Sequence, residues 1–463
     1  MGANMDESDG NADYAGAAAR IMARSALAQG VLADQLAGDA AAEQGLRRTR
    51  ALTDALGRPQ DSLTIVHVAG TKGKGSTVAF ISSILVAAGV RTGRLTSPHL
   101  ARLTERITID ERDIDDETFV AITDLVLSRV ETLERDRPEL GRCNVLEVLF
   151  ATALVAFREA GCRVAVIEVG IGGRLDTTNI VDPAVSVITT LDLEHTAILG
   201  DTLAEIAFEK AGIVKPGRPV IVAPQPAIAL DVIRQRAAAS GSRLLVIGNE
   251  EGTADERRIG LAGPHQRGNA ALAVAALREL GSLDPGLTAD SDAIRSGLAR
   301  AWLPGRFEVV PPDAVRLLAG VDASGAVPVV VLDGAHTPRA AAALRETLDT
   351  TVVSQSGALL ALCGFAADKD IRAFLGALRP DRVQPVAAAS PRAVPTLAIS
   401  GIAADLGIVV MEGPDTVGPA LRRVVRDEAM TGESPLATVV VTGSFIVVAE
   451  ARAALGLSDR HDE

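Results

Sequence analysis

Aromatic residues and cysteines are scarce in this sequence. Phe, Trp and Tyr together make up 2% of its 463 residues, so any core must be built mainly from Ala, Val, Leu and Ile. The three cysteines, Cys143, Cys162 and Cys363, lack the spacing of metal ligands. An odd, sparse set of this kind excludes a disulfide framework and suits a reducing compartment.

Long apolar runs and an excess of basic charge are lacking as well. No apolar run approaches the roughly 18 residues that a membrane span requires, and the polar, acidic start is unlike a secretory signal. The formal net charge is −13, whereas nucleic acids and anionic membranes bind basic faces. We therefore expect a soluble, cytoplasmic, monomeric protein that binds neither nucleic acid nor membranes.

Lysine is also rare, because arginine supplies most of the positive charge. Of the 46 basic residues, the lysines are Lys72, Lys74, Lys210, Lys215 and Lys369. Each is therefore a candidate for chemistry that needs an ammonium group rather than a generic cation. Chance retention is the simpler explanation, but it weakens because Lys72 and Lys74 fall in one glycine-rich loop.

The length and the strand pattern predict two α/β domains. We expect a disordered tail at 1–20 and an Ala- and Arg-rich helix within 21–57. Short β-branched runs then alternate with helical stretches such as 77–88 and 145–160, which is typical of a parallel sheet with crossover helices. The predicted strands are 63–68, 163–169, 184–189, 219–223 and 244–248, then 328–332, 359–363, 383–388, 407–411 and 438–441. The segment 302–306 interrupts regular structure, so we place the domains at 21–302 and 303–463.

The strongest local signal is a glycine loop between a predicted strand and a predicted helix, with the sequence AGTKGKGST at 69–77. Glycines let backbone N–H groups surround phosphate oxygens, and a helix N-terminus adds partial positive charge. Lys74 could reach the terminal phosphates of a nucleotide, and the Ser76 hydroxyl could face Mg²⁺. The match to a Walker A motif is imperfect because Val68 replaces a glycine and Gly75 separates the Lys from the Ser. An ordinary glycine turn is the alternative.

Acidic residues and histidines follow other predicted strands. Glu168 ends one strand and would need a cation, either Mg²⁺ or Arg174. His195 follows a second strand, and Asp333 and His336 follow a third, in the second domain. Parallel sheets place their active sites at such strand ends, although each of these residues could also belong to a simple turn.

Together these motifs resemble the folylpolyglutamate synthase and dihydrofolate synthase family, which is related to the muramyl peptide ligases. The resemblance covers roughly residues 45–455. It rests on GTKGKGST (70–77), TSPHL (96–100), EVGIGGRLDTTN (168–179), LEHTAILGD (193–201), FEKAGIVK (208–215), GPHQRGNA (263–270), LPGRFE (303–308), LDGAH (332–336), DKD (368–370) and TGSF (442–445). It implies an α/β fold, with a P-loop ATPase domain on a parallel sheet and a smaller C-terminal Rossmann-like glutamate ligase domain.

The resemblance also implies an activity, in which ATP and Mg²⁺ drive addition of L-glutamate to dihydropteroate or reduced folates through an acyl phosphate. The implied catalytic residues are Lys74, Lys210 and His195, with Lys210 carried as an N-carbamate (N6-carboxylysine). The implied ATP contacts are Gly73, Lys74, Gly75, Ser76, Asn269, Arg306 and Asp333. The implied metal ligands are Ser76, Ser97, Glu168 and His195, and the implied acceptor pocket is Asn144, Val145, Leu146, Glu147, Leu175, Asp176 and Thr177.

Three positions depart from the family pattern. Leu146 stands where a pterin-stacking Phe is usual, Thr337 where Asn is usual, and Lys72 where bacterial members mostly have Asn. The acceptor could therefore differ, and a related muramyl-type amide ligase acting on another carboxylate is the alternative enzyme. Such ligases normally carry a further N-terminal nucleotide-sugar domain, which the segment before the glycine loop is too short to form. A P-loop regulator that hydrolyses ATP as a switch is the alternative of another class.

Overall fold

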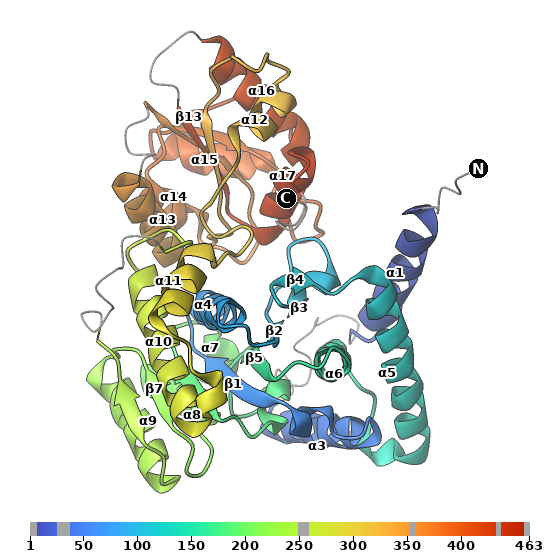
Figure 1. Ribbon diagram of the computed structural model, residues 1–463. Coiled ribbons are helices and arrows are strands. Elements are labelled where there is room, and N and C mark those ends of the chain that lie inside the picture. The colour runs from blue at the N-terminus through green and yellow to red at the C-terminus, as the bar shows by residue number, and fades with distance from the viewer. Residues whose placement is uncertain (1–6, 26–37, 249–258, 352–356, 432–436, 458–463) are drawn as a thin grey trace. The chain divides into compact units, whose positions relative to one another are not determined.

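The computed structural model describes residues 7–25, 38–248, 259–351, 357–431 and 437–457 (Figure 1). The chain forms two compact units. One comprises Met1–Gly260 and Arg267–Ala301, and the other comprises Leu261–Gln266 and Trp302–Glu463. Among the described residues, no helix is long and apolar enough to cross a membrane.

The first unit is built on an eight-stranded sheet with the order β4-β3-β2-β5-β1-β6-β7-β8. The pairs β2–β3 and β3–β4 are antiparallel, and the other neighbouring pairs are parallel. The central strands are apolar and almost fully buried, because helices cover both faces of a parallel sheet. The strands are β1 (Thr64–Ala69), β2 (Thr92–Leu95), β3 (Ile107–Ile109), β4 (Arg112–Asp113), β5 (Val164–Glu168), β6 (Val185–Ile188), β7 (Val220–Val222) and β8 (Leu244–Val246).

Some helices of this unit begin at a residue whose side chain caps the helix. Asp115, Asn144 and Thr202 each accept a hydrogen bond from a backbone N–H in the first turn of the helix that follows. The helices are α1 (Glu7–Met22), α3 (Asp39–Ala55), α4 (Lys74–Ala87), α5 (Asp116–Asp136), α6 (Val145–Glu159), α7 (Thr196–Leu199), α8 (Leu203–Ala211), α9 (Ala227–Ala239), α10 (Gln266–Leu283) and α11 (Ser291–Arg300).

The second unit has a six-stranded sheet with the order β13-β12-β11-β14-β10-β9, in which only β9 runs antiparallel to its neighbour. Its strands are β9 (Glu308–Val309), β10 (Val329–Leu332), β11 (Leu359–Cys363), β12 (Arg382–Pro385), β13 (Val409–Val410) and β14 (Thr438–Thr442). Its helices are α12 (Pro312–Ala319), α13 (Pro338–Thr350), α14 (Ile371–Leu378), α15 (Thr396–Asp405), α16 (Val417–Met430) and α17 (Phe445–Ala454).

This architecture confirms the α/β class, with a larger parallel sheet and a smaller Rossmann-like one. Each of the ten predicted strands overlaps an observed strand. Strands β2, β3, β4 and β9 were not predicted, because they are only two to four residues long and, except for β3, contain Arg, Asp, Glu or Gly. The second unit also includes 261–266, which the sequence-based division placed in the first domain.

The expectation of a disordered tail at 1–20 is wrong for its described part. Helix α1 covers Glu7–Met22 and lies beside α5 (Figure 1). Ala17 and Ile21 are fully buried in the core, and the Tyr14 ring lies 5.7 Å from that of Phe119. The few apolar side chains on one face of α1 are thus sufficient for this helix to pack on the unit, because α5 supplies the surface that they contact. Residues 26–37 of the predicted helix 21–57 lie outside the described residues, and α3 covers the later part.

Candidate active site

The candidate site lies at the carboxyl ends of four adjacent strands, β2, β5, β1 and β6. In a parallel sheet these ends meet at one edge, so the loops that follow them share a surface. Those loops carry Ser97 after β2, Val169–Asp176 after β5, Gly70–Gly73 after β1 and Thr189–His195 after β6. The predicted residues of the first unit that lie on these loops are thereby brought to one edge.

The glycine loop after β1 is packed so tightly that two of its glycines admit no side chain. Gly70 has φ +149°, and a Cβ there would lie 1.8 Å from Thr189 Oγ1. Gly73 has φ +88°, and a Cβ there would lie 2.3 Å from Asn269 Oδ1. Asn269 of α10 therefore packs against the loop, a contact that local sequence alone could not show.

Helix α4 starts at Lys74, directly after this loop. Its first N–H groups have no intrahelical acceptor, so Lys74, Gly75 and Ser76 present donors and partial positive charge at the helix start. The Lys74 Nζ lies 3.5 Å from the carbonyl oxygen of Thr71, which places the ammonium over the loop. Ser76 is buried in the first turn. A strand, a glycine loop and a helix N-terminus in this order can hold phosphate groups.

The loop after β6 is joined to the glycine loop at several points. The N–H groups of Thr71 and Lys72 donate to the Thr190 carbonyl, at 3.0 and 3.1 Å. Lys72 Nζ pairs with Glu194 Oε1 at 2.9 Å. Burial opposes ionisation of Glu194, but Lys72 outweighs it and lowers the pKa of that carboxyl. His195, which follows, is exposed and has a left-handed backbone with φ 55°. Sequence reasoning gave Glu194 no role, although it stands directly before His195.

Glu168 lies at the end of β5, where it is only 6% exposed. Its Oε2 accepts a hydrogen bond of 3.0 Å from the Ser97 N–H, so two of the predicted metal ligands adjoin. The alternative cation, Arg174, pairs instead with Glu209 and Asp39, at 2.7 and 2.8 Å. A buried carboxylate beside a phosphate-binding loop suits a divalent cation.

The predicted ligands fit magnesium better than a transition metal. Within the described part of the chain, no three or more His, Cys, Asp or Glu side chains form a group that could hold an ion by themselves. Mg²⁺ typically binds one or two carboxylates and completes its coordination with waters and substrate phosphates. The predicted set supplies one carboxylate, two hydroxyls and one imidazole, which is compatible with this type of magnesium coordination. Ser76, Ser97, Glu168 and His195 remain a predicted set.

Lys210 on α8 is buried at this edge, with 4% of its surface exposed. Its Nζ donates a hydrogen bond of 2.9 Å to the Gly70 carbonyl, directly beneath the glycine loop. Burial, followed by the positive charge of Lys74, lowers the pKa of Lys210 to about 7. A lysine with this pKa is partly a neutral amine near neutral pH, which is the form that reacts with CO₂ or another electrophile.

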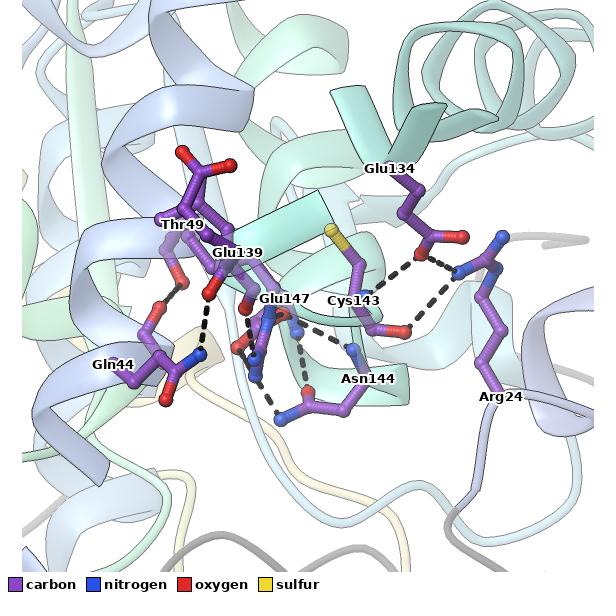
Figure 2. A network of polar contacts seen from close by, with 11 residues as sticks. Arg24, Gln44, Thr49, Glu134, Glu139, Cys143, Asn144 and Glu147 are labelled. Carbon is purple, nitrogen blue, oxygen red and sulfur yellow. Dashed lines mark hydrogen bonds and ion pairs between the residues drawn. The ribbon is translucent and has the colours of Figure 1, made fainter. Parts of the chain in front are cut away.

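On the predicted acceptor side, Asn144 and Glu147 form the start of α6 (Figure 2). Glu147 is fully buried, and Arg48 donates from Nε and Nη2 to its two oxygens at 2.7 and 2.6 Å. Asn144 and Glu147 also exchange hydrogen bonds of 3.0 Å in a capping box. Their polar groups therefore build the helix start, while Val145 is buried and Leu146 is half-buried. Arg48, about a hundred residues away in sequence, carried no local signal.

The second predicted acceptor segment contains one buried carboxylate and one pocket residue. Asp176 accepts hydrogen bonds from the N–H groups of Ile171 and Thr178, and burial raises its pKa. Thr177 is half-buried. Leu175 lines a pocket between the start of α3, the loop after β5, α7 and α8. An adjoining pocket of about 410 Å³ is bordered by Arg174 and Phe208.

The predicted nucleotide contacts of the second unit lie at the end of β10 and in the segment before β9. Asp333 accepts hydrogen bonds of 2.8 Å from the N–H groups of Phe307 and Ala335. Burial raises the pKa of Asp333, and the charge of Arg306 opposes that shift. The Arg306 guanidinium lies 4.5 Å above the ring centre of Phe445. Their role toward a nucleotide remains a prediction from the resemblance.

Comparisons with known proteins bear on this arrangement. No model of a protein family matches the chain. It is 38% identical over 325 residues to the dihydrofolate synthase/folylpolyglutamate synthase of Bacillus subtilis, a match that covers 66% of this chain and 72% of that protein.

Two solved structures resemble the whole chain. Mycobacterium tuberculosis folylpolyglutamate synthase complexed with ADP has a TM-score of 0.80 and 28% identity, and the match covers 97% of this chain and all of that one. E. coli FolC in complex with DHPP and ADP has a TM-score of 0.75 and 30% identity, and the match covers 95% and 97% of the two chains. From the similarity along its length, the chain belongs to the folylpolyglutamate synthase and dihydrofolate synthase family.

Proposed function

We propose that this protein is an ATP-dependent ligase that joins the amine of L-glutamate to the carboxylate of dihydropteroate, of reduced folates, or of both. The observation that carries the proposal is the convergence of the glycine loop, Glu168 with Ser97, and Lys210 at one sheet edge. The two structural relatives, with ADP in one and with DHPP and ADP in the other, support it.

The glycine loop and the start of α4 would hold the phosphates of ATP. Backbone N–H groups of Gly73, Gly75 and Ser76 donate to phosphate oxygens, and Lys74 neutralises charge that develops during transfer. Asn269, packed against Gly73, fixes the shape of the loop near the nucleotide. Arg306 and Asp333 are the contacts proposed from the second unit.

Mg²⁺ would be held by Ser76, Ser97, Glu168 and His195, where it would supply charge neutralisation on the transferring phosphoryl group. Glu168 is oriented for this by the Ser97 N–H. Lys210, as a carbamate, would place a negative charge beside Lys74 at the same edge.

The reaction has two steps that balance without a further reactant. The acceptor carboxylate oxygen attacks the γ-phosphorus of ATP, which forms an acyl phosphate and releases ADP. The glutamate amine then attacks the acyl carbon, the amide bond forms, and phosphate leaves as the amine loses a proton. Residues that exclude water from the acyl phosphate protect it from hydrolysis.

We place the acceptor's ring system near Leu175, in the adjoining pocket of about 410 Å³ that Arg174 and Phe208 border, next to the α8 helix that carries Lys210. Following the resemblance, we also assign to the acceptor Asn144, Val145, Leu146, Glu147, Asp176 and Thr177, with Leu146 as the half-buried apolar contact. We also propose that the protein acts as a cytoplasmic monomer on small-molecule substrates, without nucleic acid or membrane. The acidic net charge of −13 supports the last point.

Mass spectrometry of the products tests the proposed function. The protein is incubated with ATP, Mg²⁺, glutamate and a panel of dihydropteroate, tetrahydrofolate and a UDP-sugar peptide. We expect a gain of one or more glutamate units on a pterin, with one ADP released per bond. Product on the UDP-sugar peptide alone would support the muramyl-type alternative. Phosphate release that glutamate does not stimulate, without product, would support an ATPase switch.

A further inference from the structure

The single tryptophan of the chain packs against a buried ion pair in the second unit. The guanidinium of Arg452, on α17, lies 5.5 Å from the ring centre of Trp302, within the range of a cation–π contact. Arg452 also pairs through Nη1 with Glu308 Oε1. The two charged side chains are only 8% and 9% exposed, so water screens this pair very little.

The other oxygen of Glu308 holds the backbone just before it. Glu308 Oε2 accepts a hydrogen bond of 2.8 Å from the Gly305 N–H. The Gly305 carbonyl in turn accepts a bond of 2.9 Å from the Gly334 N–H. Glu308 therefore bridges Arg452 on α17 to the turn at Gly305.

Arg306 stands between two residues whose backbones are anchored. On one side is Gly305, and on the other is Phe307, which has φ +48° and donates its N–H to Asp333. A non-glycine residue in the left-handed region is strained and persists only when its surroundings hold it. The direction in which Arg306 leaves the chain thus depends on the contacts of Gly305, Phe307 and Glu308.

We propose that the Arg452–Glu308 pair, with Arg452 in cation–π contact with Trp302, positions Arg306 for the nucleotide. Glu308 and Arg452 are positioning residues, because they act through the Gly305–Phe307 turn. The inference rests on the proposed function in one respect, which is that Arg306 contacts ATP.

The chemistry of the pair fits a positioning role better than a stabilising one. Desolvation of two charges offsets much of their attraction, so a buried ion pair adds little net stability over an apolar pair. A guanidinium can at once pair with a carboxylate and stack flat on an indole, which an ammonium does poorly. Both contacts fix the orientation of the Arg452 side chain, and through Glu308 they fix the turn from which the Arg306 side chain extends.

The test uses a double variant that leaves no charge buried alone. In Arg452→Met/Glu308→Gln we expect the Trp302 emission to shift to longer wavelength as water reaches the indole. We expect KM for ATP to rise about tenfold or more, because a small displacement of a contact group has large effects, whereas KM for glutamate stays unchanged. Arg452→Lys, which keeps the charge, should restore part of the ATP affinity. The matched control is Arg372→Met/Asp405→Asn, an exposed pair of the same unit, which should change neither signal.

A thermodynamic cycle with Arg306→Ala decides between positioning and general structure. If the pair acts through Arg306, the double variant has no further effect on ATP affinity in the Arg306→Ala background. An equal loss in both backgrounds would refute the inference, and so would a normal ATP affinity in Arg306→Ala. Affinity for the analogue AMPPCP, measured by calorimetry, provides the same cycle without turnover. This cycle measures nucleotide binding alone, so it does not depend on which acceptor is used. An incorrect acceptor assignment would be detected in the mass-spectrometric product assay instead.

Discussion

Replacement of Lys210 tests the least ordinary part of the proposed site. Lys210→Ala removes the buried amine that donates to the Gly70 carbonyl, and we expect it to abolish ligation while the fold persists. The reason is electrostatic rather than steric. Burial and the neighbouring Lys74 disfavour an ammonium here, so the site favours the neutral amine, which is the form that adds CO₂.

The pKa of Lys210 determines how much reactive amine is present. An ordinary lysine with a pKa near 10.5 is neutral in about one molecule in 3,000 at pH 7, whereas a pKa of about 7 makes roughly half of the molecules neutral. The neutral amine can add CO₂ and lose a proton to form a carbamate. The negative carbamate would convert the repulsion from Lys74 into attraction.

The pH dependence has a definite sign. Between pH 7 and pH 6 the neutral fraction falls from about one half to about one tenth. Carbamate formation also releases a proton, so with dissolved CO₂ held constant and limiting, the carbamate and the activity should fall about fiftyfold over this interval and return when CO₂ is added near pH 8. The same depressed pKa means that the folded state binds fewer protons than the unfolded state between about pH 7 and 10.5, so the free-energy cost of burying Lys210 falls, and stability rises, with pH across this window.

Carbon-13 NMR of protein equilibrated with labelled CO₂ measures the carbamate directly. We expect one carbamate signal that is absent from Lys210→Ala, together with partial recovery of that variant's activity by a short-chain carboxylate. Lys215→Ala is the matched control, because burial also lowers the pKa of Lys215, to about 8, and it bonds the Asn179 carbonyl. Fully active protein without the signal, or normal activity in Lys210→Ala, would refute the reasoning.

Three further predictions address the metal, the acceptor and the fold. Glu168→Gln should lose activity and its dependence on Mg²⁺, because an amide cannot neutralise a divalent ion; unchanged Mg²⁺ titrations would remove Glu168 from the site. Leu146→Phe should lower the acceptor's KM by up to about tenfold, from a stacking gain of about 0.5–1.5 kcal/mol, and leave KM for ATP unchanged; an unaltered acceptor KM would contradict the placement of Leu146. Arg48→Met should cost about 3–5 kcal/mol in the free energy of unfolding because Glu147 stays buried and unpaired, whereas Arg48→Met/Glu147→Gln should recover most of it; thermal denaturation of both variants checks this.

The sheets could be predicted because each central strand can be recognised from its own residues. A run such as 163–169 is apolar and β-branched, and burial on both faces of a parallel sheet requires little else. Strand β4 could not be found in this way. It consists of Arg112 and Asp113, which carry no apolar or β-branched signal, and it pairs antiparallel with β3. Helix α1 was missed because its docking surface, α5, is remote in sequence.

The same distinction applies to the candidate site. Glycines, a lysine and strand-end acids are visible in the sequence, and the topology then brings them to one edge. Partners that come from far along the chain are not visible. The pairing of Lys72 with Glu194 spans 122 residues, and that of Arg48 with Glu147 spans 99 residues. Sequence patterns alone therefore could not show that Arg48 engages both oxygens of Glu147.

The position of β1 in the sheet has a consequence for how the chain folds. Strand β1 lies between β5 and β6, and its partner in register with Thr64 is Val164, one hundred residues later. During synthesis this apolar strand, with the glycine loop attached, must wait until β5 has emerged before its first edge is paired, and until β6 has emerged before its second edge is paired. Such non-local pairing slows folding, and an unpaired apolar edge invites aggregation. Truncated chains that end before β6 should therefore be insoluble rather than merely inactive, because they expose the strand that carries the phosphate loop.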